Sequence, residues 1–168
     1  MKIEIGPYPD DDSERKIDVQ LDKFDTWNMD DTLAHIILPM LKQLKETKQG
    51  SHIVDDEDVP EQLRTTSNTY QDHAGDQTVF EFEDDEEFED QMWAQYEVRW
   101  NWVLDEMIWA FEQKTTNWDE QFYSGDPGEG FDDPNSTFKA DYDGMTKHSA
   151  RMCNGFRLFG KYYEGLWD

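Results

Sequence analysis

The chain has 168 residues, with 40 Asp and Glu against 15 Lys and Arg, and its formal net charge is −25 at pH 7. This length is typical of one domain, so we expect a single domain over residues 1–168. The charge argues against direct binding to nucleic acid, because a polyanion releases no counterions from another polyanion. It argues equally against docking on anionic lipid.

The remaining composition points to a packed, non-secreted protein. No run of eighteen apolar residues occurs and residues 1–5 do not resemble a signal peptide, so we expect a soluble protein. A single cysteine, Cys153, excludes an internal disulfide and a cysteine-based zinc site and suits a reducing cytoplasm. Seven Trp, seven Tyr and ten Phe predict a real core inside acidic segments.

Residues 1–24 carry the pattern of a small antiparallel ribbon. Apolar and polar residues alternate in 2–5 and again in 16–21, which is typical of half-buried strands. A turn-rich stretch begins at Gly6 between them. Because two strands alone are marginally stable, we expect this ribbon to lean on a helix.

A helix is predicted over residues 28–48, from about Met29 to Lys48. Its apolar residues recur at helical spacing and form one stripe. They are Leu33, Ile36, Ile37, Met40, Leu41 and Leu44. The following stretch, 49–85, is predicted as an acidic loop. Over residues 49–98, sixteen acids face one base, so 1 − 16 gives a charge of −15.

A second helix is predicted over residues 86–113, with apolar side chains on two sides. The main stripe consists of Trp93, Tyr96, Trp100, Val103, Leu104, Met107 and Phe111. Trp102 and Trp109 lie on another side, which indicates a central helix or a face offered to a partner. Turn residues then predict a second acidic loop over 114–143.

A C-terminal helix is predicted over residues 144–168, with its regular part from about Met145 to Tyr163. Its apolar stripe consists of Met145, Met152, Phe156, Phe159 and Tyr163. Gly155 and Gly160 allow close backbone approach. Residues 139–168 carry five bases and four acids, so 5 − 4 gives +1, and this helix can lie against the acidic remainder. The predicted fold is therefore mainly α (α+β), with three main helices, an N-terminal β-ribbon and long acidic loops.

The sequence contains no catalytic signature and predicts no cofactor, no metal site and no catalytic residue. Phosphate-binding glycine loops, a nucleophile elbow and zinc-protease motifs are all absent. Cys153 is interpreted as a buried structural thiol on the apolar side of the last helix. Asp31 and His35, one helical turn apart, could share a metal, but a helix cap and a residue at the core edge explain them more simply.

One enzymatic alternative remains open. All-α nucleotide pyrophosphohydrolases hold magnesium with paired glutamates on a helix. Glu86, Glu87 and Asp90 imitate that motif by composition, although no matching motif follows on the next helix. A magnesium-dependent hydrolase is thus the alternative to a binding protein.

The densest negative charge lies at residues 81–90, where eight of ten residues are acidic. Closely spaced carboxylates among aromatic residues can occupy a cationic groove, as a nucleic-acid mimic does, whereas a solvated loop only confers solubility. The predicted acidic binding surface consists of Glu81, Glu83, Asp84, Asp85, Glu86, Glu87, Glu89 and Asp90. Trp102 and Trp109 form the predicted aromatic binding face.

Several stretches resemble a group of small acidic proteins of tailed bacteriophages, many of them marine. They are 21–27 (LDKFDTW), 36–45 (IILPMLKQLK), 54–60 (VDDEDVP), 102–112 (WVLDEMIWAFE) and 156–168 (FRLFGKYYEGLWD). The resemblance implies a phage origin, and hence the host cell cytoplasm, and implies no particular activity.

These observations together favour a non-catalytic protein that acts by protein–protein interaction. The expected partner is a protein, in particular a basic host protein, with no direct nucleic-acid or membrane binding. The alternatives are a virion or assembly component, in which the tryptophan face is the seam of a homo-oligomer, and the hydrolase above.

Overall fold

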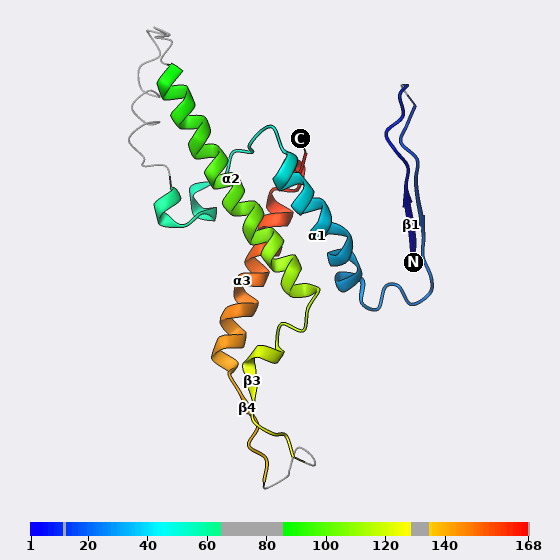
Figure 1. Ribbon diagram of the computed structural model, residues 1–168, viewed down its shortest axis with the longest axis vertical. Coiled ribbons are helices and arrows are strands. Elements are labelled where there is room, and N and C mark those ends of the chain that lie inside the picture. The colour runs from blue at the N-terminus through cyan, green and yellow to red at the C-terminus, as the bar shows by residue number, and fades with distance from the viewer. Residues whose placement is uncertain (12, 65–85, 129–134, 168) are drawn as a thin grey trace.

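The computed structural model describes residues 1–11, 13–64, 86–128 and 135–167, with the backbone alone described for 86–92. The fold is mainly α, as predicted, and three helices pack together. They are α1 (Met29–Thr47), α2 (Glu86–Lys114) and α3 (Tyr142–Lys161). The long α2 is central, because α1 and α3 both pack against it (Figure 1).

The core is built around α2 and closed by a segment that precedes it. Trp100, Val103, Leu104 and Met107 of α2 are all buried. The other core residues are Ala34 and Leu41 of α1, Phe111 of α2, Leu158 and Tyr162 at α3, and Val54 and Val59 of the α1–α2 connection. The predicted stripe of α2 is therefore confirmed over its C-terminal half, and Val54 and Val59 bind the acidic connection to the helices.

The start and the buried face of α3 differ from the prediction. The helix begins at Tyr142, because the Asp141 carboxylate accepts a hydrogen bond from the backbone N–H of Gly144 (2.9 Å). Its buried residues are Met152, Gly155 and Leu158, with Tyr162 just beyond its end, whereas Tyr163 is exposed. The buried residues Gly155, Leu158 and Tyr162 therefore each lie one position before a residue of the predicted stripe through Phe156, Phe159 and Tyr163, and one position is about 100° around a helix.

The N-terminal ribbon forms but remains uncovered. β1 (Lys2–Ile5) pairs antiparallel with β2 (Ile17–Gln20), with Ile3 opposite Val19 and Ile5 opposite Ile17. These cross-strand pairs place the apolar residues on one face, yet Ile5, Ile17 and Val19 are all exposed. The ribbon stands beside α1 rather than on it (Figure 1). The expectation that a helix covers its apolar face is wrong.

The stretch 114–143, predicted as a loop, contains a second small ribbon. A 3-10 turn, η3 (Glu120–Phe122), leads into β3 (Tyr123–Ser124), which pairs with β4 (Lys139–Ala140). Gly125 follows β3 with a φ of 82°, and a Cβ there would lie 2.1 Å from the Thr137 carbonyl oxygen. The sequence pattern is too short to indicate strands of two residues each.

The described residues contain three further 3-10 turns. η1 (Asp56–Asp58) and η2 (Glu61–Leu63) follow α1, and η4 (Tyr163–Gly165) continues the chain after α3. The regular helix therefore ends at Lys161, two residues before the predicted end at about Tyr163. Among the helices of the described ranges, none combines the length and apolar character needed to cross a bilayer.

Candidate functional site

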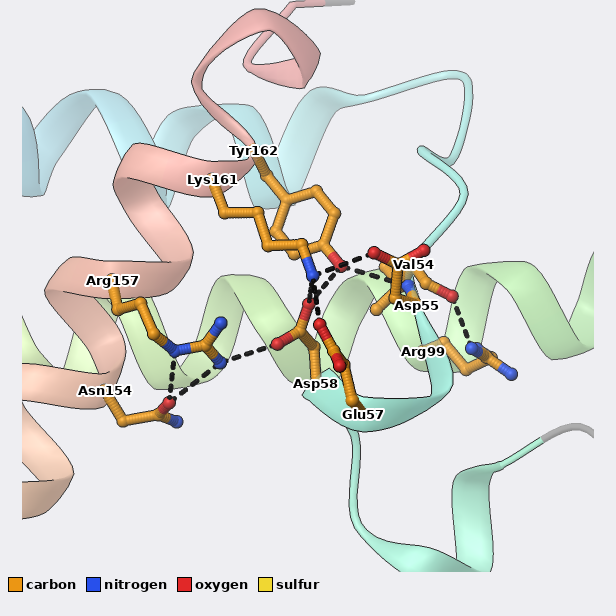
Figure 2. A network of polar contacts seen from close by, with 9 residues as sticks. All are labelled: Val54, Asp55, Glu57, Asp58, Arg99, Asn154, Arg157, Lys161 and Tyr162. Atoms are coloured by element: carbon orange, nitrogen blue, oxygen red, sulfur yellow. Dashed lines mark hydrogen bonds and ion pairs between the residues drawn. The ribbon is translucent and has the colours of Figure 1, made fainter.

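The densest polar cluster in the described residues joins η1 to the end of α3. The Lys161 ammonium lies 2.8 Å from Asp55 Oδ2, 3.0 Å from Glu57 Oε1 and 2.5 Å from Asp58 Oδ2. Figure 2 shows the lysine reaching down from α3 among the three carboxylates. One cation therefore holds the single acidic turn η1, together with Asp55 before it, against the end of α3.

Asp58 is the buried member of this cluster. Its side chain is 1 % exposed, and both oxygens are bound: Arg157 Nη2 lies 2.6 Å from Oδ1, and the Tyr162 hydroxyl donates to Oδ2 at 2.6 Å. Burial by itself would raise the pKa of Asp58, but hydrogen bonds from Lys161, Tyr162 and Arg157 outweigh it, so the pKa is lowered. Asp58 is thus an anion whose partners come almost entirely from α3.

The hydrogen bonds in this cluster also fix the protonation states of two partners of Asp58, Tyr162 and Lys161. Burial, and then the hydrogen bond to Asp58, raise the pKa of Tyr162 to about 12. The same hydroxyl accepts a hydrogen bond from the Asp55 backbone N–H (3.0 Å). Hydrogen bonds to Asp55, Asp58 and Glu57 raise the pKa of Lys161. At neutral pH the cluster therefore contains a charged lysine and a neutral tyrosine.

These carboxylates also have the spacing of cation ligands. One oxygen from each of Asp55, Glu57 and Asp58 lies within 4.8 Å of the others. The Lys161 ammonium already contacts all three oxygens and supplies the positive charge that they need. The geometry is therefore that of an internal clamp, which we call the η1–α3 clamp (Asp55, Glu57, Asp58, Arg157, Lys161 and Tyr162).

Most other Lys and Arg side chains of the helical bundle also form ion pairs between segments. α1 with its adjoining Lys48, α2 and α3 together contain nine Lys and Arg residues, and eight of them pair with a carboxylate of another segment. The pairs outside the η1–α3 clamp are Lys42–Glu112, Lys45–Asp105, Lys48–Glu97, Lys114–Asp30, Arg99–Asp56 and Arg151–Glu106. The few Lys and Arg side chains thus stabilise contacts between segments, and the carboxylates that remain unpaired with them give the protein its negative charge.

Arg99 is the most buried of these cations. Its Nη1 lies 2.7 Å from Asp56 Oδ1, and its Nη2 donates to the Val54 carbonyl oxygen. Its Nε has no hydrogen-bond partner among the described residues. Together with the η1–α3 clamp, Arg99 fixes the acidic connection to α2 as well as to α3 (Figure 2).

The predicted acidic binding surface lies largely outside this description. Glu81, Glu83, Asp84 and Asp85 are outside the described residues. Glu86, Glu87, Glu89 and Asp90 belong to the first turns of α2, but their side chains are outside the description too. The acidic surface and the alternative magnesium ligands Glu86, Glu87 and Asp90 therefore both stay predictions.

The predicted aromatic face is engaged within the fold. Trp102 is partly buried against the core. The Arg151 guanidinium lies 3.9 Å from the centre of the Trp109 ring, whose other neighbour is His148 at 4.9 Å between ring centroids. His148 also stacks on Trp118 at 5.1 Å, and its Nε2 lies 3.0 Å from Gln113 Oε1. Trp109 thus helps to bind α3 to α2, and the described structure brings no acidic-surface residue to it.

Cys153 is exposed, so its interpretation as a buried thiol is wrong. It follows the buried Met152 by about 100° around α3, which turns it away from α2. Sequence reasoning also missed Lys161 and Tyr162 as the centre of a polar cluster. The net charge of +1 over residues 139–168 was the available signal, and its implication that this helix lies against acidic segments is confirmed.

Searches against protein-family models, curated proteins and solved structures gave no match to this chain.

Proposed function

We propose that this protein has no catalytic role and acts by binding a basic protein through its outward-facing carboxylates. The observation that carries this proposal is the use of eight of nine cations of the helical bundle in pairs between segments. With a net charge of −25 and its cations so engaged, the protein presents a negative field to other molecules. Such a field accelerates encounters with cationic surfaces and opposes anionic ones.

The rigidity of the bundle supports recognition rather than mere solubility. Carboxylates recognise a partner efficiently when a fixed scaffold holds them, since ordering them on binding costs conformational entropy. Arg99 and the η1–α3 clamp provide such fixation for Asp55, Asp56 and Glu57. Where the partner is itself a nucleic-acid-binding protein, the outward-facing carboxylates that remain beyond these internal pairs would stand in for phosphates. We further propose the host cell cytoplasm as the place of action, following the resemblance to phage proteins.

The test is capture of basic proteins from a host lysate at two salt concentrations. Binding should fall steeply between about 50 mM and about 300 mM NaCl, because screening shortens the reach of surface charge. A variant with all eight carboxylates of residues 81–90 converted to amides should bind more weakly than the natural chain. Salt-independent capture, or no capture at about 50 mM salt, contradicts the proposal.

The chain offers a matched control for that variant. Residues 1–25 also contain eight Asp and Glu residues, so converting them to amides changes the net charge by the same amount. If the 81–90 surface is the recognition surface, the 81–90 variant should lose more binding than the 1–25 variant. Equal losses would show that the whole negative field, rather than residues 81–90, attracts the partner.

A further inference from the structure

An apolar groove runs along α1, between this helix, the C-terminal segment and the β1–β2 turn. Its volume is about 1010 Å³, and its walls come from three parts of the chain. Leu33, Met40 and Leu44 of α1 line one wall, Phe159 and Trp167 of the C-terminal segment line another, and Tyr8 of the β1–β2 turn lines the third. Figure 1 shows the C-terminus beside the C-terminal end of α1, and the N-terminal ribbon standing apart at the right of the view.

Large apolar side chains are exposed at this groove. Met40 is 61 % exposed, Trp167 is 74 % exposed and Tyr8 is 78 % exposed. An apolar patch that remains in water, bordered by polar segments, is typical of an interaction site. Among the described residues, none of those that line the groove is charged. A ligand in the groove would therefore make hydrophobic contacts, and only the charged residues around the groove would act on it electrostatically.

The dimensions of the groove fit one α-helix. The lining residues of α1 extend from Leu33 to Thr47, which is about 21 Å along the helix axis at about 1.5 Å per residue. A helix with its side chains is about 10–12 Å across, so this volume accommodates the apolar face of about two to four turns. Laying an amphipathic helix into an apolar groove is a recurrent mode of peptide recognition.

The charges around the groove select a cationic occupant. The lysines of α1 turn to the other side, where Lys42 and Lys45 pair with Glu112 and Asp105. Among the described residues, the β1–β2 turn has three acids (Asp10, Asp11 and Glu14) and two bases, one of which, Arg15, lies over the Tyr8 ring at 4.2 Å. The described C-terminal stretch 162–167 has one acid, Glu164, and no base. A second copy of the chain would bring a further charge of −25 to this rim.

We propose that this groove binds an amphipathic α-helix of a partner protein, with apolar residues on one face and Lys or Arg on the other. This inference rests on the proposed function and assigns a docking site to it. The apolar face of the partner helix fills the groove, while its cations face the acidic turn and the acidic C-terminal stretch. Hydrophobic burial supplies affinity, and the surrounding charge excludes acidic helices.

The probe is a synthetic 14-residue peptide with Leu at helical spacing on one face and Lys elsewhere. Its controls are an isomer of the same composition without the apolar face and a peptide with Glu replacing Lys. Calorimetric titration of the full chain at about 150 mM NaCl should show at least about tenfold tighter binding of the amphipathic Lys peptide than of either control, a difference of about 1.4 kcal/mol.

Two methionines of α1 provide matched variants. Met40 lines the groove, whereas Met29 is similarly exposed and does not line it. M40D should weaken binding of the Lys peptide about tenfold, although its added negative charge would by itself attract the peptide. M29D should leave the affinity unchanged. W167A, which alters no helix, should also weaken binding, and circular dichroism verifies that all three variants fold.

The alternative outcomes separate the two proposals. If the amphipathic peptide and its isomer bind alike and M40D has no effect, the docking site is overturned while the basic-partner function stands. If neither Lys peptide binds even at about 50 mM NaCl, the proposed function fails as well. Tight binding of the Glu peptide overturns the cationic occupant, and a dimer in sedimentation that M40D dissociates assigns the groove to a second copy.

Discussion

Gly155 allows α3 to lie against α2 without a side chain between them. A Cβ at this position would lie 2.4 Å from the Cβ of Ala110 and 2.6 Å from the Glu106 carbonyl oxygen. Neither neighbour is the free end of a flexible side chain, so the helices themselves would have to move apart. At Gly160, about one and a half turns later, no atom of another described segment lies within 4 Å of the corresponding position. The expectation of close approach is thus confirmed at the first glycine only.

The two glycines of α3 should respond in opposite directions to alanine. G155A should lower the free energy of unfolding by about 1–3 kcal/mol, the usual cost of overpacking. G160A should leave it unchanged or raise it by up to about 1 kcal/mol, since alanine favours the helix. Urea denaturation of both variants measures the difference. Equal stability of G155A and the natural chain would contradict the close contact between α2 and α3.

Asp58 should make the stability of the protein depend on pH in acid. Its pKa is lower in the folded state than its usual value of 3.8, so its stabilising contribution is complete well above that value. The contribution is lost as the pH falls through the folded-state pKa. D58N should therefore be less stable than the natural chain at pH 7, and the gap should narrow below about pH 4. Urea denaturation between pH 7 and pH 3 tests this.

A control for that experiment is D10N, in the exposed β1–β2 turn. The free energy of unfolding of D10N should differ little from that of the natural chain at every pH. If the stability difference between D58N and the natural chain stays constant as the pH falls, the packing of the Asp58 side chain matters rather than its charge.

At the scale of elements, the connection after α1 is held by ion pairs more than by regular structure. η1 has three residues, and its side chains are bound by Lys161 and Arg157 of α3 and by Arg99 of α2. Val54 and Val59 add apolar contacts on either side. The connection is therefore ordered by its partners, because a single 3-10 turn has little stability of its own.

Lys161 should be the residue on which the order of this connection depends. K161M removes the charge and keeps an unbranched chain, so Asp55 and Glu57 lose an ion pair and Asp58 loses one of its three cationic or hydroxyl donors. Amide hydrogen exchange at residues 55–59 should accelerate markedly. K147M, on the same helix, is the control, because Lys147 makes no ion pair with any residue in the described part of the chain. Similar exchange in both variants would contradict the clamp.

At the scale of the whole molecule, repulsion among carboxylates competes with the pairs between segments. Exposed ion pairs contribute up to about 1 kcal/mol each and are weakened by salt. Self-repulsion at a net charge of −25 is weakened by salt too, and 40 acids against 15 bases leave it the larger effect. The protein should therefore become more stable as salt is added.

The melting temperature should rise by about 2–4 °C for each kcal/mol of repulsion that is screened between about 10 mM and about 300 mM NaCl. Thermal denaturation followed by circular dichroism measures this. The variant with the eight acids of residues 1–25 converted to amides should show a smaller rise. A melting temperature that falls with salt would show that the ion pairs between segments outweigh the repulsion.

The sequence by itself determined the helices and their charge. The periodicity of residues 29–47 and of the later part of α2 is local information, and it predicts both the helices and the buried stripe through Trp100 and Met107. Net charges of −15 for residues 49–98 and +1 for residues 139–168 likewise indicated that α3 pairs with acidic segments. Helical periodicity and net charge can be obtained from a stretch of sequence alone, because neither depends on which other segments that stretch contacts.

Only the tertiary structure decided which residues from distant parts of the sequence come into contact. The side of α3 that carries Gly155 packs on α2, because this glycine lets the two helices approach closely, so Tyr162 is buried in place of Tyr163 and Cys153 is exposed. Three-dimensional packing also puts Lys161 among three carboxylates about a hundred residues away and leaves the apolar face of the ribbon in water. Contacts over such sequence separations depend on how the helices cross, and that is a property of the assembled core.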